Sequence, residues 1–181
     1  MLRRGDFLAL IGDLGSGKTA FARALILRMM DPDNIEEVPS PSFALLQTYE
    51  ATRLPVYHYD FYRLIAPEDA LETGFEEALN EGLVLAEWPQ KLGPLMPDDR
   101  LEIHFLETDN DERRQLNLVA HGSFAPRLAR FIDINRFLFD AGWDTAWRQF
   151  LQGDASARSY TRLMKIDDRA LLMDAPRQPD G

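Results

Sequence analysis

A lysine and a threonine close an eight-residue, glycine-rich stretch, Gly12-Asp13-Leu14-Gly15-Ser16-Gly17-Lys18-Thr19. Its order, G-x-x-x-x-G-K-[ST], is that of a phosphate-binding P-loop. Glycines let successive backbone N–H groups turn toward an anion, and the helix that follows directs its positive end to the same place. Lys18 would then reach the β- and γ-phosphates, and the Thr19 hydroxyl would bind Mg²⁺. The alternative is a glycine turn that arose by chance.

The segments on either side of this stretch are those that a P-loop requires. Before it, residues 6–11 form a short apolar run that predicts a buried strand. After it, residues 20–30 are rich in strong helix formers. Strand, glycine loop and helix in this order favour nucleotide binding at residues 12–19.

Two acidic residues follow short apolar strands further along the chain. Glu87 ends the most hydrophobic run, residues 83–86, and Asp60 ends residues 56–59. In open α/β sheets ligands collect at the carboxyl ends of the strands, so both acids are expected near the P-loop. A P-loop site needs such an acid to hold Mg²⁺ or to order the attacking water. The alternative for each is a solvated carboxylate at a strand end.

Three further side chains have both a functional and a structural interpretation. Ser42, within residues 40–43, could contact the γ-phosphate or join the Mg²⁺ shell, or it could belong to a rigid turn. Trp88 could stack on a base or close the site, or it could pack in the core. His58 is expected to be a hydrogen-bonded histidine of the sheet, with a catalytic role as the alternative.

Composition limits the class of protein. The chain has 181 residues, a formal net charge of −10 and no cysteine, which excludes disulfides and thiolate chemistry. No apolar run approaches the ~18 residues of a membrane span, and we expect a cytoplasmic protein. The acidic excess lies in residues 1–120, which should repel nucleic-acid phosphates rather than bind them. The Asn-Lys-x-Asp run with which GTPases read guanine is missing, which favours ATP.

The remaining apolar patterns of this part predict an α/β sheet of mixed direction. Residues 43–49 and 56–60 are expected to pair as antiparallel strands, and residues 83–87 to form a buried parallel strand. Residues 100–107 and 114–120 alternate apolar and polar side chains, which predicts a second antiparallel pair.

Five blocks of residues follow one another between roughly residues 5 and 120. They are the P-loop, Ser40-Pro41-Ser42-Phe43, His58-Tyr59-Asp60-Phe61-Tyr62-Arg63-Leu64, Glu72-Thr73-Gly74-Phe75 and Glu87-Trp88-Pro89. In this order they resemble the bacterial TsaE family, the ATPases of tRNA threonylcarbamoyladenosine biosynthesis. The resemblance implies an α/β, P-loop NTPase-like three-layer fold with a mixed, mainly parallel central sheet over residues 1–122.

The resemblance also implies ATP hydrolysis in support of the TsaD–TsaB threonylcarbamoyltransferase. It carries functional roles onto Lys18 and Thr19 of the P-loop. It carries others onto Asp60, Glu87, Trp88 and Ser42, with Ser42 as the switch hydroxyl.

The chain differs from the family in two respects. Position 42 is Ser where the family usually has Thr, a change that keeps the hydroxyl. The family also has a strand and a helix before the P-loop strand, whereas this chain begins almost at that strand. We therefore expect part of the base-binding wall and one edge of the sheet to be absent, with a cost in nucleotide affinity and stability.

The character of the sequence changes in residues 123–181. Apolar residues recur at helical spacing over residues 124–140, and residues 143–150 are expected to form a second short helix. A small-residue loop at 153–162 is expected between two short strands. This part resembles the opening of the aminoglycoside-phosphotransferase-like sugar kinases, which implies the remnant of a fused kinase whose remainder is missing. The alternative is a C-terminal extension docked on the ATPase.

Together these observations predict an ATPase that binds ATP and Mg²⁺ at residues 12–19. Thr19 and Glu87 would hold the metal, directly or through water, while Asp60 and Ser42 position the γ-phosphate and the attacking water. The motifs contain no arginine finger, so hydrolysis should be slow until a partner completes the site. Neither a membrane nor direct tRNA binding is expected. Two alternatives remain open, a P-loop small-molecule kinase and a nucleotide-dependent interaction module without significant turnover.

Overall fold

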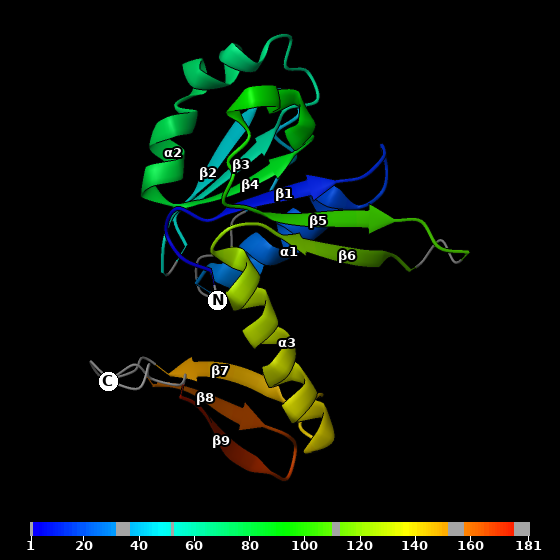
Figure 1. Ribbon diagram of the computed structural model, residues 1–181, viewed down its shortest axis with the longest axis vertical. Coiled ribbons are helices and arrows are strands. Elements are labelled where there is room, and N and C mark those ends of the chain that lie inside the picture. The colour runs from blue at the N-terminus through cyan, green and yellow to red at the C-terminus, as the bar shows by residue number, and fades with distance from the viewer. Residues whose placement is uncertain (1, 32–36, 52, 110–112, 152–157, 176–181) are drawn as a thin grey trace. The chain divides into compact units, whose positions relative to one another are not determined.

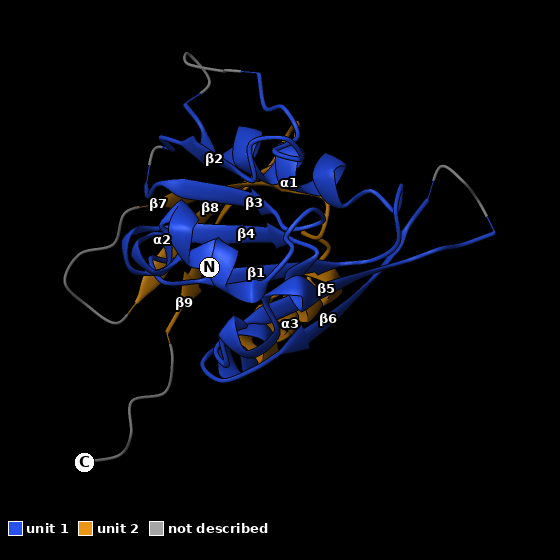
Figure 2. Ribbon diagram, turned by 90° about the horizontal axis from the view of Figure 1, so that it is seen from above, with its two compact units in different colours: residues 1–128 blue, residues 129–181 orange. Residues whose placement is uncertain are grey.

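The computed structural model describes all residues except 1, 32–36, 52, 110–112, 152–157 and 176–181. Internal contacts divide the chain into two units, residues 1–128 and residues 129–181, which Figure 2 colours separately. The residues predicted to bind nucleotide all belong to the first unit. Among the described residues, no helix is long and apolar enough to cross a membrane.

A six-stranded sheet forms the centre of the first unit, in the order β2-β3-β4-β1-β5-β6 (Figure 1). The strands from β3 to β5 run parallel, and β2 and β6 pair antiparallel at the two edges. The predicted α/β fold with a mixed, mainly parallel sheet is therefore confirmed. The strands are β1 (Phe7–Ile11), β2 (Leu46–Tyr49), β3 (Val56–Asp60), β4 (Leu83–Glu87), β5 (Leu101–Leu106) and β6 (Gln115–Ala120).

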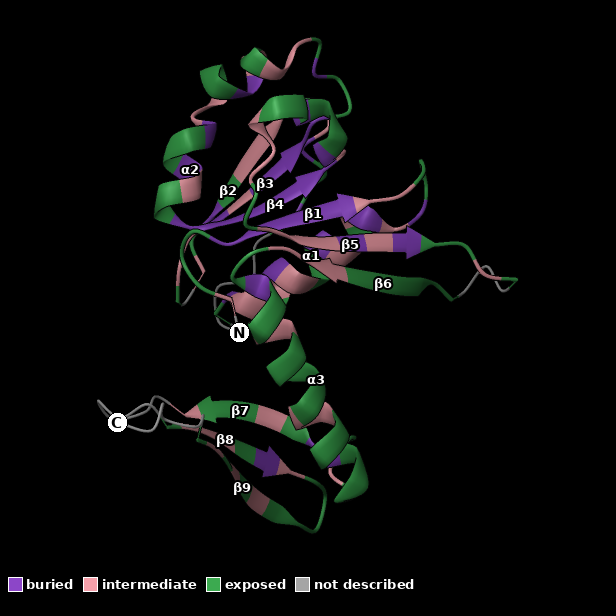
Figure 3. Ribbon diagram, in the orientation of Figure 1, coloured by how far each residue is buried: buried purple, intermediate pink, exposed green. Residues whose placement is uncertain are grey.

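Burial explains why the central strands are continuous apolar runs in the sequence. Every residue of β4 is buried, as are residues 7–10 of β1, whereas residues 115–118 of the edge strand β6 are exposed. Figure 3 shows this gradient from the purple centre of the sheet to the green edge. A strand that is covered on both faces needs apolar side chains at every position, and an edge strand does not.

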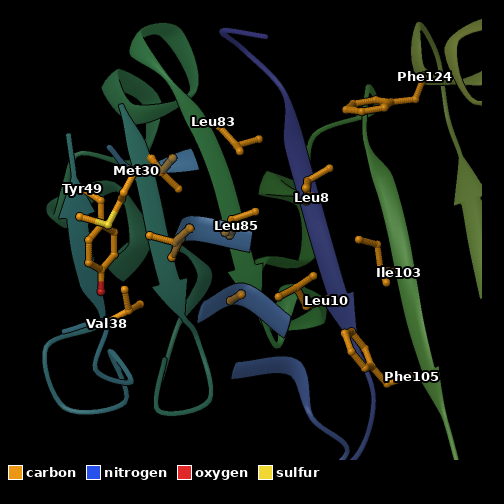
Figure 4. Close-up of a cluster of buried hydrophobic side chains, with 13 residues drawn as sticks. Leu8, Leu10, Met30, Val38, Tyr49, Leu83, Leu85, Ile103, Phe105 and Phe124 are labelled. Carbon is orange, nitrogen blue, oxygen red and sulfur yellow. The ribbon is translucent and has the colours of Figure 1, made fainter. Parts of the chain in front are cut away.

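Helices cover both faces of this sheet and produce three layers. On one face lies α1 (Lys18–Met29), and on the other lie α2 (Phe75–Glu81) and the 3₁₀-helices η1 (Pro67–Thr73) and η2 (Pro89–Leu95). Alternate residues of each strand enter the two cores, because successive side chains point to opposite faces. Figure 4 shows the core on the α1 side, where the labelled side chains include Leu8, Leu10, Leu83, Leu85, Ile103 and Phe105.

The segment before β2 differs from its prediction. The strand expected from residue 43 begins only at Leu46, and residues 42–45 form a turn instead. Within this turn Leu45 has a left-handed φ of 63°, and its N–H donates to the Pro41 carbonyl at 2.7 Å. The Leu45 carbonyl in turn accepts from the Asp60 N–H at 3.0 Å, which ties the turn to the end of β3.

The second unit combines the later part of α3 (Phe124–Asp140) with an antiparallel sheet of β7 (Trp147–Leu151), β8 (Ser159–Met164) and β9 (Arg169–Asp174). Its small core contains Leu138, Ala146 and Leu163. The helix predicted at 124–140 is confirmed. The helix predicted at 143–150 is wrong, because residues 147–150 pair with β8 as part of β7. Residues 153–157 of the predicted small-residue loop lie outside the described residues. Residues 159–162, which were also assigned to the loop, form the start of β8 instead.

Candidate nucleotide-binding site

The glycine-rich stretch connects the end of β1 to the start of α1 (Figure 1). Gly15 and Gly17 have left-handed φ values of 81° and 103°, which residues with a side chain rarely adopt. The helix begins directly after Gly17, whose carbonyl accepts from the Phe21 N–H at 2.9 Å. The N–H groups of the first helical turn have no partner within a helix, and they are the groups that bind anions in loops of this kind.

Lys18 is 4% exposed, and its ammonium group folds back onto the loop. Its Nζ donates to the carbonyl oxygens of Gly12 and Asp13, both at 2.7 Å, and lies 3.5 Å from Ser16 Oγ. Burial lowers the pKa of Lys18, and the neighbouring carboxylates oppose this shift by stabilising the cation. The ammonium is thus held by neutral carbonyls at the place where a phosphate would compete for it.

A hydrogen bond joins the P-loop helix to the central sheet. Thr19 Oγ1, in the first turn of α1, donates to Glu87 Oε2 at 2.8 Å. Glu87 is the last residue of β4, is 2% exposed, and lies beside Asp60 in the β3–β4 register. The structure therefore brings both predicted acids to one edge of the sheet, next to the threonine.

Both carboxylate oxygens of Asp60 accept hydrogen bonds. Ser42 Oγ donates to Asp60 Oδ2 at 2.5 Å, and the Tyr62 N–H donates to Oδ1 at 3.0 Å. The Ser40 and Ser42 hydroxyl oxygens are 2.8 Å apart. The turn at residues 42–45 is what carries Ser42 to this position, so the predicted switch hydroxyl and the β3 acid form one pair.

Trp88 covers one side of the site in a strained backbone conformation. Its φ and ψ are 57° and 45°, left-handed values that cost a residue with a side chain about 1–2 kcal/mol. The Lys18 Nζ lies 4.1 Å from the centre of the Trp88 ring, a cation–π contact. The Tyr62 ring packs against the same indole at 5.0 Å between ring centres. The strained residue directly after Glu87 thus places an aromatic face over the ammonium.

One residue of the site, Tyr62, was not predicted by the sequence reasoning. Tyr62 lines the pocket and contacts both Asp60 and Trp88. His58 places Nε2 2.9 Å from Glu87 Oε1 and has no exposed surface. This contact agrees with the expectation that His58 is a hydrogen-bonded histidine of the sheet.

A pocket of about 230 Å³ opens between these groups. The P-loop, the turn, β3 and the end of β4 all contribute side chains to it. Three predicted nucleotide-binding residues, Gly12, Asp13 and Ser16, are outside the lining and contact the ammonium of Lys18 instead. The lining residues are Leu14, Gly15, Gly17, Lys18, Thr19, Ala20, Ser42, Asp60, Tyr62, Glu87 and Trp88.

The oxygen donors at Thr19 and Glu87 suit a hard cation such as Mg²⁺. In the described part of the chain, no three His, Cys, Asp or Glu side chains form a group that could hold a metal ion by themselves. Mg²⁺ fits this limited donor set, because it usually takes one or two protein oxygens together with phosphate and water. The other two histidines, His104 and His121, place Nε2 2.9 and 3.2 Å from the carboxylate of Glu102.

Known proteins share most of this unit. A family model described as "Threonylcarbamoyl adenosine biosynthesis protein TsaE" matches residues 1–116. The tRNA threonylcarbamoyladenosine biosynthesis protein TsaE of Rickettsia conorii is 43% identical over 112 residues, which are 62% of this chain and 63% of that protein. The protein of the same name from Bacillus subtilis is 31% identical over 125 residues, 66% of this chain and 72% of its own.

A solved structure agrees in fold. The crystal structure of Bacillus subtilis YdiB matches with a TM-score of 0.57 and 27% sequence identity, covering 72% of this chain and 78% of that chain. The matched region of the Rickettsia conorii protein is less than two thirds of its length. The agreement therefore concerns the P-loop unit of this chain.

Proposed function

This chain belongs to the TsaE family, a nucleotide-binding family of tRNA threonylcarbamoyladenosine biosynthesis proteins, and from that premise we propose that it binds and hydrolyses ATP with Mg²⁺. One observation carries the proposal: the Lys18 ammonium, the Thr19 hydroxyl and the Glu87 and Asp60 carboxylates converge on a single pocket. These are the groups that phosphoryl transfer requires, namely a phosphate-binding cation, metal-binding oxygens and an acid near the attacking water.

Nucleotide binding would exchange the partners of Lys18. The ammonium donates to the Gly12 and Asp13 carbonyls in the structure, and a phosphate oxygen is a stronger, charged acceptor. The backbone N–H groups at the start of α1 add neutral donors to the same anion. The triphosphate would thereby be held at the end of β1, with its γ-phosphate toward the carboxylates.

Hydrolysis would then depend on the groups across the pocket. Thr19 and Glu87 are the residues that would hold Mg²⁺, which would neutralise part of the negative charge of the phosphates. Asp60, oriented by Ser42, would accept a hydrogen bond from the water that attacks the γ-phosphorus as the bond to ADP breaks. The contribution of the chain is mostly positioning and electrostatic stabilisation.

The proposal also includes a protein partner and a cellular compartment. None of the described residues that line the pocket is an arginine, so these residues provide no arginine finger, and we expect slow turnover without a partner. We infer that TsaD–TsaB, the threonylcarbamoyltransferase implied by the family, completes the site in the cytoplasm. The acidic charge of residues 1–120 favours contact with a protein partner over direct contact with tRNA.

The test is ATP hydrolysis by the wild-type chain and by Lys18→Ala, each alone and with TsaD–TsaB. We expect Lys18→Ala to lose at least ~100-fold in turnover, as for the loss of a principal charge-stabilising donor. Lys91→Ala, which removes an exposed lysine outside the pocket lining, serves as the matched control and should hydrolyse ATP as the wild type does. Equal turnover of Lys18→Ala and wild type under both conditions would sink the proposal. Tight ATP binding without turnover would favour an interaction module instead.

A further inference from the structure

A histidine with no exposed surface lies behind the pocket. His58, in the middle of β3, is 0% exposed, and its Nε2 is 2.9 Å from Glu87 Oε1. Among the described residues, its Nδ1 has no hydrogen-bond partner. The contact with Glu87 is therefore the polar contact that the described structure gives to this imidazole.

The surroundings of His58 are otherwise those of a hydrophobic core. Its neighbours on the same face of the sheet include Val56, two residues before it, and Leu85, its register partner on β4, and both belong to the α1-side core. A buried polar ring costs free energy unless it is hydrogen-bonded, and an apolar side chain would serve packing alone without that cost. The distinctive property of a histidine here is the N–H that it offers to Glu87.

The two oxygens of Glu87 have separate partners. Oε1 lies 2.9 Å from His58 Nε2 on the buried side. Oε2 accepts a hydrogen bond from Thr19 Oγ1 at 2.8 Å on the pocket side. As a metal ligand Glu87 must be ionised, and its oxygens then only accept hydrogen bonds, which makes His58 Nε2 the donor in the metal-bound site. The terminal torsion of a glutamate is broad, and a carboxylate without such contacts would rotate. Two donors on opposite sides fix it in one orientation.

We propose that His58 is a positioning residue that orients Glu87 for the metal and for Thr19, an inference that rests on the proposed function of the pocket. Its effect passes through Glu87, because His58 is outside the pocket lining. Residues that hydrogen-bond to a metal ligand without binding the metal themselves typically change metal affinity or activity ten- to a hundredfold when they are removed. The residue should therefore govern the Mg²⁺ dependence of the site more than nucleotide binding as such.

The experiment compares His58→Leu with His58→Gln in the full chain. Leucine removes the donor, whereas the glutamine amide can present an N–H near the position of Nε2. For each variant, binding of a non-hydrolysable ATP analogue is measured in EDTA and across a Mg²⁺ titration, and ATP hydrolysis is measured across the same titration. We expect His58→Leu to raise the half-saturating Mg²⁺ concentration about tenfold or more. Analogue binding in EDTA should stay within about twofold of wild type, and His58→Gln should recover most of the Mg²⁺ response.

Three results would overturn the inference. The first is an unchanged Mg²⁺ response in His58→Leu. The second is an equal loss of analogue binding with and without Mg²⁺, which indicates a purely structural role. The third is a His58→Gln variant as impaired as His58→Leu. If His58→Leu does not fold, the Mg²⁺ responses of His58→Gln and His58→Asn are compared instead. The shorter asparagine amide cannot reach Glu87, so equal Mg²⁺ responses of these two variants would overturn the inference.

A second mutation separates this inference from the proposed function. In a Glu87→Ala background, His58→Leu should add no further loss of Mg²⁺ response, since residues that act as one unit are not additive. An additional loss of similar size overturns the positioning role.

The Lys18→Ala variant distinguishes a failure of the His58 inference from a failure of the proposed function of the pocket. Impaired binding in Lys18→Ala with a normal Mg²⁺ response in His58→Leu overturns the His58 inference alone, whereas normal analogue binding in Lys18→Ala overturns both.

Discussion

Thr19→Val removes the hydroxyl that joins α1 to β4 and keeps the branched shape of the side chain. This hydroxyl donates to the buried Glu87 carboxylate at 2.8 Å. A hydrogen bond to a charged group contributes about 1.5–3 kcal/mol to stability. Because Thr19 itself is half-buried, we expect the lower end, a loss of about 1.5 kcal/mol in the free energy of unfolding. For a chain of this size, that corresponds to a fall in Tm of roughly 3–6 °C.

The assay is urea and thermal unfolding of wild type, Thr19→Val and the matched control Thr19→Ser. The serine variant keeps the hydroxyl and should lie within about 0.5 kcal/mol of wild type. Mg²⁺ and ATP at about a hundred times the dissociation constant should stabilise the wild type by about 2.7 kcal/mol. The valine variant should lose most of this gain because it lacks a metal-binding oxygen. Wild-type stability together with a full ligand-induced gain in Thr19→Val would refute the reasoning.

Three further changes test other parts of the structure. Gly82→Ala would bring a Cβ to 2.3 Å from the Pro55 carbonyl oxygen, so the backbone must move. Unfolding experiments should show a loss of about 1–3 kcal/mol in the free energy of unfolding. An unchanged free energy of unfolding would contradict this close approach. Burial would raise the pKa of Glu102, but hydrogen bonds from a neighbouring histidine and arginine lower it overall. The carboxylate therefore stabilises the fold above its unfolded-state pKa, and this contribution is lost as the pH falls through the folded-state pKa. Glu102→Gln should lower stability by about 1 kcal/mol at pH 7 and converge with wild type in acid, whereas a pH-independent difference refutes the assignment. Ser42→Ala leaves Asp60 without its hydroxyl donor, and steady-state hydrolysis should show kcat lowered about tenfold, with Ser42→Thr retaining activity; equal kcat in Ser42→Ala contradicts the pairing.

The P-loop and the strand ends were predictable because local sequence determines them. The spacing of Gly15, Gly17 and Lys18 forces one loop geometry between a strand and a helix, and the structure has this geometry. Glu87 ends an apolar run that predicted a buried parallel strand, and Asp60 ends another strand of the same α/β sheet, where ligands collect at the carboxyl ends of the strands. The structure accordingly brings these side chains to one pocket, although their roles there remain a proposal.

The errors arose where distant parts of the chain decide local structure. Residues 147–150 of the helix expected at residues 143–150 are strand, because pairing of β7 with β8 overrides an apolar pattern that also fits a helix. The turn that carries Ser42 depends on a left-handed leucine, Leu45, which no turn rule predicts since such positions usually take glycine or asparagine. The contact between His58 and Glu87 depends on the register of β3 against β4. The sequence of either strand alone does not determine this register.

The most direct measurement is a calorimetric titration of a non-hydrolysable ATP analogue with Mg²⁺ into the wild-type chain and into Lys18→Ala. The Lys18 ammonium is buried beside the loop that would hold the phosphates, so its removal should weaken binding far more than a surface substitution does. We predict one bound nucleotide per chain for the wild type and at least tenfold weaker binding for Lys18→Ala, a difference of about 1.4 kcal/mol or more. Equal affinity of the two proteins, or no binding to the wild type, would contradict the assignment of this pocket to ATP.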